Sequence, residues 1–184
     1  MRRKEREMDK EFGMDIIDKS RYGVLSMVDG DLPYGVPLSI ARDENYLYFH
    51  SAKEGRKAKA LRGNPNVSIA FVGEAEVPEL YTKEELDEMA KDESKAIVFI
   101  SSVFTTQFES AVVKGKVEIV EDEKERVRGI ELICKKYTPT KMDYFNIGVK
   151  AGLGQADIYR VEIEEIKAKR KKYDIDGNEM KGTI

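Results

Sequence analysis

Hydrophobic and polar residues alternate in several short runs along the chain. A period of two is typical of strands that bury one face and expose the other. This pattern predicts strands at residues 21–28, 33–41, 46–49, 66–72, 109–120 and 156–164. The strongly apolar run at residues 96–104 predicts one more strand, buried on both faces.

Apolar residues also recur at helical spacing. They predict helices at residues 8–20 and 122–137. The helix-forming residues at 56–62, followed by Gly63-Asn64-Pro65 as a stop, predict a third helix. A charged excursion at about 77–94 contains Thr82 and Glu85 at capping-box spacing, which predicts a short surface helix there. We therefore expect one domain at residues 1–166 and a charged C-terminal tail at 167–184, with a turn at 174–178.

The expected strands follow one another in groups of two or three, joined by short turns. Regular alternation of strands and helices would instead indicate a parallel sheet. The pattern favours a mainly β (α+β) fold, an antiparallel sheet or closed barrel flanked by helices.

Composition narrows the functional classes. The chain has 184 residues, 36% of them charged, and a net charge of -3, which argues against a cationic nucleic-acid binder. No apolar run approaches the length needed to span a bilayer. A single cysteine, Cys134, excludes an intramolecular disulfide, and we expect a cytoplasmic protein. One cysteine and one histidine also exclude a zinc site built only from those residue types.

The stretch from Tyr46 to Asn64 joins an expected strand to an expected helix. Gly55 provides a flexible joint, and Arg56 and Lys57 begin the helix. The first N–H groups of a helix lack partners within it, and the helix dipole favours an anion there. This stretch is therefore a candidate phosphate seat, the alternative being a solvated basic helix face.

The expected strand at 33–41 contains two prolines and a glycine. Proline lacks an N–H and suits an edge or a bulge, while glycine in a strand often marks the close approach of a ligand. A plain edge strand explains the same residues.

Four motifs occur in a recognisable order: Tyr22-Gly-Val-Leu-Ser26, Pro33-Tyr-Gly-Val-Pro-Leu-Ser39, Leu47-Tyr-Phe-His-Ser-Ala52, and Gly55-Arg-Lys57 followed by Asn64-Pro65. This order resembles the FMN-binding split-barrel family (pyridoxamine 5'-phosphate oxidase-like), and within it the nitroimidazole-resistance-type flavoproteins. Residues 105–110 also look like the family's Thr/Ser segment before a central strand. Two departures are a longer connection at 74–102 and a longer tail after Lys167.

The resemblance implies a six-stranded split barrel that works as a homodimer, with FMN at each subunit boundary. It places the phosphate at the 50–57 stretch, the flavin ring along 36–39, and the 105–110 segment near the ring or on the partner chain. The implied flavin-binding residues are Val36, Pro37, Leu38, Ser39, His50, Ser51, Ala52, Gly55, Arg56, Lys57, Thr105 and Ser110.

His50 is the only histidine, and the matching histidine of the nitroimidazole-resistance-type proteins sits at the active site. Three interpretations remain open: contact with the flavin, general acid catalysis because its ordinary pKa lies near neutrality, or a cap on a hydrogen-bond network.

The resemblance leads to an FMN-dependent oxidoreductase acting on a nitroaromatic or similar small electron acceptor, with chemistry supplied by the cofactor. One alternative is a pyridoxamine-phosphate oxidase proper, although no second phosphate cluster is visible. Another is a protein that holds flavin or haem without turnover, with His50 as an axial ligand. The third is a small β-barrel nucleic-acid module, against which the acidic net charge stands.

Overall fold

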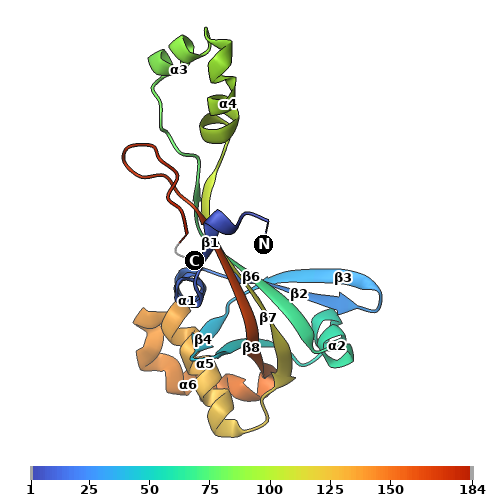
Figure 1. The fold of residues 1–184 in the computed structure, drawn as a ribbon. Coiled ribbons are helices and arrows are strands. Elements are labelled where there is room, and N and C mark those ends of the chain that lie inside the picture. The colour runs from blue at the N-terminus through green and yellow to red at the C-terminus, as the bar shows by residue number, and fades with distance from the viewer. Residues whose placement is uncertain (1, 183–184) are drawn as a thin grey trace.

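A single antiparallel sheet organises the molecule (Figure 1). The computed structural model describes residues 2–182. The sheet has eight strands, seven of them in the order β3-β2-β6-β7-β8-β5-β4, and β1 pairs separately with β8. The strands are β1 (Glu7–Met8), β2 (Gly23–Asp29), β3 (Leu32–Leu38), β4 (Ala41–Asp43), β5 (Tyr46–Ala52), β6 (Asn66–Glu76), β7 (Gln107–Ile119) and β8 (Ala156–Lys171).

The antiparallel α+β fold expected from the sequence is confirmed, and the open, curled sheet is that of a split barrel. The strand count differs, with eight strands instead of six. The two extra strands, β1 and β4, have only two and three residues. Strands this short cannot show hydrophobic alternation, so only their pairing with β8 and β5 reveals them.

Helices surround the sheet and form the tip of an arm. They are α1 (Lys10–Lys19), α2 (Arg56–Gly63), α3 (Lys83–Met89), α4 (Ala96–Val98), α5 (Glu123–Tyr137) and α6 (Phe145–Gly152). Short 3-10 segments occupy Lys4–Arg6, Glu93–Lys95, Pro139–Tyr144 and Leu153–Gln155, and a π-helical segment occupies Phe99–Val103. Helix α1 contacts β6, β7 and β8, whereas α5 contacts β4 and β5.

The two faces of the sheet bury different apolar clusters. The larger cluster includes Leu25, Phe71 and Val113, with Phe49 stacked on Tyr159 at 5.0 Å between ring centroids. The smaller cluster is centred on Tyr48, Val120 and Ile158, with further apolar side chains of α5 packed against it. Because successive residues of a strand face opposite sides, β5 and β8 contribute to both clusters.

A bulge bends the long strand pair β7–β8. The register shifts between Lys114 and Gly115, and a Cβ atom at Gly115 would clash with the carbonyl oxygen of Glu162. Only glycine allows the two backbones to approach this closely.

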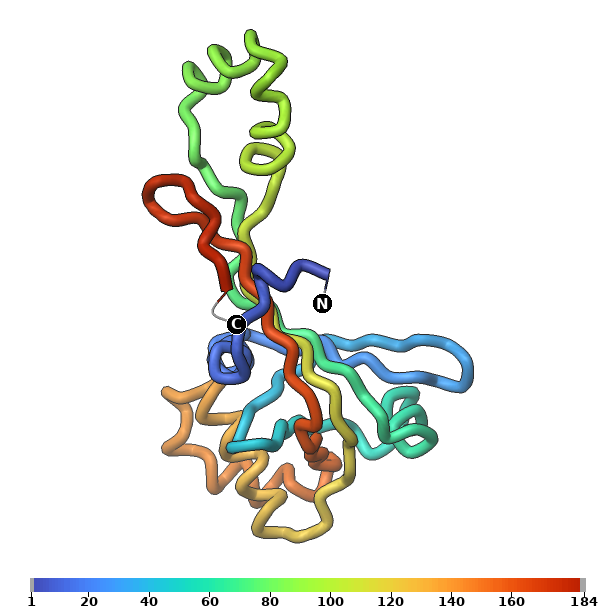
Figure 2. Tube along the Cα trace, viewed as in Figure 1, coloured from blue at the N-terminus to red at the C-terminus, as the bar shows by residue number. Residues whose placement is uncertain are grey.

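The ends of β6 and β7 lead into an arm that projects from the body (Figure 2). Residues 77–106 form the tip of this arm, and the expected capping box is confirmed there. Thr82 accepts a hydrogen bond from the N–H of Glu85 at 3.3 Å, and the Glu85 carboxylate accepts one from the N–H of Thr82 at 2.7 Å.

The prediction of a buried strand at 96–104 is wrong. This run is helical, in α4 and the π-helical segment, and Ile97, Ile100 and Phe104 are 67%, 70% and 78% exposed. A short apolar run has the same composition in a buried strand and in a helix, so periodicity cannot separate the two.

The last strand is longer than its alternation indicates. It runs to Lys171, seven residues past the expected end at Glu164, because it pairs with β7 along its whole second half. The expected turn at 174–178 is confirmed, since Asp174 accepts hydrogen bonds from the N–H groups of Asp176 and Asn178. Within residues 2–182, no helix combines the length and the apolar character that crossing a bilayer requires.

Candidate functional site

The N-terminus of α2 is an uncapped helix end. Gly55 precedes it with φ 111°, a conformation that favours glycine, and no side chain accepts a hydrogen bond from the first turn. The first turn contains no acidic residue. Its N–H groups and the positive end of the helix dipole are therefore available to an anion.

Lys57 lies in this first turn and is partly buried. Its Nζ atom lies 6.0 Å from the centroid of the Phe49 ring. Burial lowers the pKa of Lys57, and no carboxylate of residues 2–182 is close enough to offset that effect. A partly buried ammonium without a counter-charge suits an anion that arrives from outside the chain.

Arg56 has a partner already. Its Nε donates to the Asp29 carboxylate at 2.7 Å, and its guanidinium carbon lies 4.2 Å from the centroid of the Tyr34 ring. The side chain is 52% exposed. The predicted bidentate grip on a phosphate must therefore use the two Nη groups, because Nε is engaged.

His50 and Ser51 lie at the end of β5 and face opposite sides. His50 pairs with Ile158 in the strand register, whereas Ser51 is 6% exposed. Burial lowers the pKa of His50, and the positive charge of Lys57 lowers it further. Both effects favour the neutral imidazole, although the residue is still partly exposed. Ala52, the next residue, is exposed.

The predicted ring-binding residues lie at the end of the edge strand β3. Val36 and Leu38 pack against the main core, while Pro37 and Ser39 are exposed. Beyond Ser39 the chain enters β4, where Ala41 pairs with Tyr48. The pairing with β5 ends at Ala41, and across β2 and β6 Leu38 is level with Ala111 of β7, so the register does not pair Ser39 with His50.

Thr105 and Ser110 lie far from His50. Ser110 pairs with Lys169 of β8, whereas His50 pairs with Ile158 of the same strand. At about 3.3 Å per residue, these positions are roughly 35 Å apart along β8. Within one chain, the structure does not bring this pair to the phosphate seat. Thr105 instead accepts a hydrogen bond from buried Lys171.

Two further residues near the seat were not predicted from the sequence. Arg62 folds back from the end of α2 and donates to the carbonyl of Lys53 at 3.3 Å. The hydroxyl of Tyr159 is buried without a hydrogen-bond partner among residues 2–182. Burial, followed by Asp157, raises the pKa of Tyr159, and Arg62 opposes this rise. The sequence contains no signal for either residue, because the position of Arg62 and the burial of the Tyr159 hydroxyl both depend on the folded structure.

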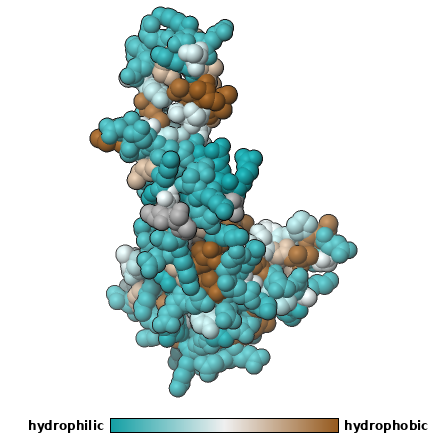
Figure 3. Space-filling model, viewed as in Figure 1, coloured by the Kyte–Doolittle hydropathy of each residue, from teal (hydrophilic) through white to brown (hydrophobic). Residues whose placement is uncertain are grey.

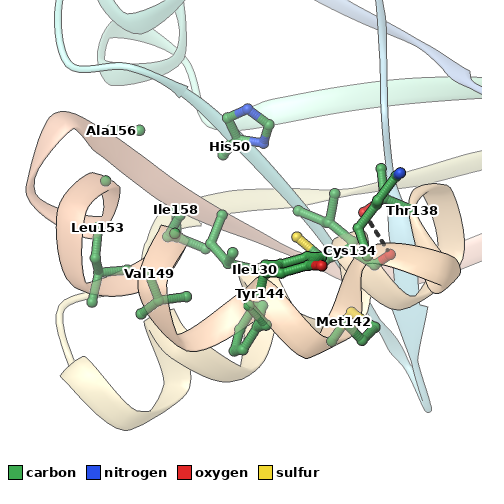
Figure 4. Close-up of a pocket in the computed structure, with 15 residues that line it drawn as sticks. His50, Ile130, Cys134, Thr138, Met142, Tyr144, Val149, Leu153, Ala156 and Ile158 are labelled. Carbon is green, nitrogen blue, oxygen red and sulfur yellow. Dashed lines mark hydrogen bonds between the residues drawn. The ribbon is translucent and has the colours of Figure 1, made fainter.

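An apolar pocket of about 450 Å³ lies between β5, β8 and the two helices α5 and α6. Figure 4 shows His50 at one edge of this pocket, with Ile158, Ile130 and Val149 beyond it. No pocket was predicted here from the sequence. Apart from His50, its walls come from the single stretch 130–158: Ile130, Ile133, Cys134, Thr138, Lys141, Met142, Tyr144, Phe145, Gly148, Val149, Gly152, Leu153, Ala156 and Ile158.

The sequence model described as pyridoxamine 5'-phosphate oxidase matches residues 9–170, nearly the whole chain. The chain belongs to this family. The match spans the sheet, the α2 seat and the α5–α6 pocket, and it confirms the resemblance drawn from the four motifs. No curated protein matches the chain.

Solved structures of the same fold have varied descriptions. A candidate 5-nitroimidazole antibiotic resistance protein from Bacteroides thetaiotaomicron is 24% identical, with 88% of this chain and 84% of that chain covered and a TM-score of 0.66. A FAD-binding protein from Mesorhizobium loti is 20% identical, with 91% and 98% covered and a TM-score of 0.59. A FAD and heme binding protein from Mycobacterium smegmatis is 14% identical, with 90% and 73% covered and a TM-score of 0.69. At these identities the likeness establishes the fold alone.

Proposed function

We propose that this family member binds FMN with the phosphate at the N-terminus of α2, and that it is an oxidoreductase for a small electron acceptor such as a nitroaromatic compound. The observation that carries the proposal is Lys57, a partly buried ammonium without a counter-charge in the first turn of an uncapped helix. One solved structure of the same fold is described as a FAD-binding protein, which supports the flavin. Another is described as a candidate 5-nitroimidazole antibiotic resistance protein, which supports the class of electron acceptor.

The residues at the seat fit a phosphomonoester. The helix N–H groups donate to its oxygens, Lys57 neutralises charge, and the free Nη groups of Arg56 supply further donors. A bound flavin accepts and donates hydride or single electrons. His50, held neutral beside the seat, presents one N–H donor and one acceptor to whatever lies against it.

The homodimer belongs to this proposal. Ser110 lies about 35 Å along β8 from His50, so a site that combines His50 with the predicted 105–110 segment requires a second copy. A symmetric pair would supply each site with this segment from the partner.

Titration of flavin-free protein with FMN, followed by quenching of flavin fluorescence, tests the seat. Lys57→Gln is expected to weaken FMN binding roughly tenfold or more, because a hydrogen bond to a charged group is lost. Lys59→Gln makes the same charge change at an exposed position of the same helix and should leave the affinity nearly unchanged. Equal losses in the two variants, or no FMN binding by the wild type, would contradict the proposal.

Turnover is tested separately. The FMN-loaded protein is reduced photochemically under nitrogen and mixed with nitrobenzene. Return of the oxidised flavin spectrum, faster than with free reduced FMN, is the expected result. Equal rates would leave the protein as a flavin binder without this activity.

A non-catalytic flavin- or haem-binding protein is the second candidate. It is favoured by the position of His50, a neutral imidazole at the edge of a large apolar pocket. A visible spectrum of the purified protein distinguishes flavin from haem. Two flavin bands support a flavoprotein, whose activity the turnover test then decides, whereas a sharp Soret band that disappears in His50→Ala supports haem.

A further inference from the structure

The arm at residues 77–106 carries an apolar face that nothing else in the described chain covers. Ile97 and Ile100 lie three residues apart in helical backbone and therefore on neighbouring positions of its surface, and Phe104 directly follows the π-helical segment. The three side chains are 67%, 70% and 78% exposed. Figure 3 shows apolar side chains gathered on the arm among polar neighbours. Contiguous exposed apolar patches of this kind mark interaction surfaces.

The base of the arm is anchored to the body. Lys171, only 6% exposed, donates to Thr105 Oγ1 and, at 3.4 Å, to the carbonyl of Ser101. Tyr173 donates from its hydroxyl to the same carbonyl at 2.8 Å. These contacts hold the apolar face in one orientation before any partner arrives, which lowers the entropic cost of docking.

A complementary hollow exists on the same chain. Tyr144 lines the apolar pocket beneath α6 and is 66% exposed, and Ile147, which lies on α6 outside the lining, is 72% exposed. The arm and this pocket lie at opposite ends of the molecule (Figure 1), so the arm cannot reach the pocket of its own chain. It can reach only the pocket of another copy.

The charges of the two surfaces are also complementary. Residues 79–95 of the arm contain seven acidic and three basic side chains. Residues 135–152, which form the end of α5 and the outer wall of the pocket, contain four lysines and one aspartate. Opposite net charge favours this pairing and opposes arm-to-arm contact, because like charges facing each other are costly.

We propose that the arm of one copy docks over the α5–α6 pocket of a second copy, with Ile97, Ile100 and Phe104 against Tyr144 and Ile147. A two-fold axis makes the contact reciprocal, so each pocket receives the partner's arm and the assembly closes as a dimer. The partner thereby contributes a wall to the pocket that contains His50. The inference rests on the homodimer of the proposed function, yet its test requires no flavin.

Cross-linking through the single native cysteine provides this test. Cys134 lines the pocket, so one cysteine added to the arm suffices. The Ile100→Cys variant is purified separately from ¹⁴N- and ¹⁵N-labelled cultures. The two preparations are mixed, treated with a short bismaleimide and digested with a protease. The expected product is a peptide pair joining position 100 to Cys134 with mixed isotopes, which proves contact between copies. Ala90→Cys, exposed on the same arm away from the apolar face, is the matched control and should cross-link far less.

Sedimentation velocity at several concentrations gives a second measure. Ile100→Asp is expected to weaken dimerisation roughly tenfold or more, because it places a charge in an apolar contact. A monomeric wild type, equal cross-linking of Ile100→Cys and Ala90→Cys, or an unchanged dimer in Ile100→Asp would each overturn the proposal. A dimer that forms this cross-link but binds no FMN would support the docking and reject the flavin function.

Discussion

Arg56 donates from Nε to the carboxylate of Asp29 at 2.7 Å, and this ion pair joins the first turn of α2 to the β2–β3 hairpin. Arg56 also lies over the ring of Tyr34 on the same hairpin, at 4.2 Å from its centroid. The contact positions the guanidinium beside the proposed phosphate seat, but it also occupies one of its donors and places a carboxylate near an anion site.

Asp29→Asn is therefore expected to raise the affinity for FMN about two- to fivefold, because it removes a like charge near the phosphate and releases Arg56. Fluorescence titration at low ionic strength measures the change. Asp31→Asn removes the same charge from an exposed position of the same turn and should have a smaller effect. Equal effects would show that Asp29 acts only through long-range charge.

The single histidine gives an unambiguous proton NMR signal. Burial and Lys57 lower the pKa of His50, so its titration midpoint should lie below the ordinary value of 6.5. Lys57→Gln should move the midpoint upward, and Lys59→Gln should leave it in place. A midpoint at or above 6.5 would contradict the placement of the imidazole against the pocket wall and Lys57.

The same shift makes stability depend on pH. Because the folded pKa of His50 is lowered, the unfolded chain binds more protons between the folded pKa and 6.5. The contribution is complete above pH 6.5 and is lost as the pH falls through the folded pKa. In urea unfolding, the wild type should therefore lose stability relative to His50→Gln as the pH falls from 6.5 through the folded pKa, whereas the difference between the two should be constant above pH 6.5.

Gly55 and Gly63 bracket α2 and should respond in opposite ways to alanine. A Cβ atom meets no neighbour within 4 Å at either position, but only Gly55 has a positive φ, 111°. Gly55→Ala is expected to lower the free energy of unfolding by about 1–2 kcal/mol. Gly63→Ala should raise it by about 0.5 kcal/mol through better helix propensity. Urea unfolding measures both, and equal signs would contradict the backbone argument.

Lys171→Met should loosen the base of the arm. The substitution leaves the buried aliphatic volume but removes the donor to Thr105 and Ser101. Amide hydrogen exchange of residues 99–106 is expected to accelerate roughly tenfold, because a charge-assisted hydrogen bond is lost. Lys167→Met, at an exposed position of the same strand, is the control. Unchanged exchange would show that the arm is held by other contacts.

The sequence by itself determined the features that arise from neighbours along the chain. Strand patterns located the six long strands, and helical spacing located α1 and α5. Thr82 and Glu85 specified their capping box, and Gly55 marked the start of α2. These signals are reliable because a period, a cap or a positive φ depends on residues within a few positions of each other.

Only the tertiary structure decided what depends on distant contacts. The apolar run at 96–104 is an exposed helical surface because β6 and β7 carry it away from the core. The ion pair between Arg56 and Asp29 and the pocket beside His50 bring together segments that are separated in sequence. The burial of the Lys57 ammonium likewise depends on its surroundings in the folded chain. The local sequence shows whether a side chain is polar or apolar. Its neighbours in the folded protein, which determine its charge balance and its solvation, come from contacts between distant segments.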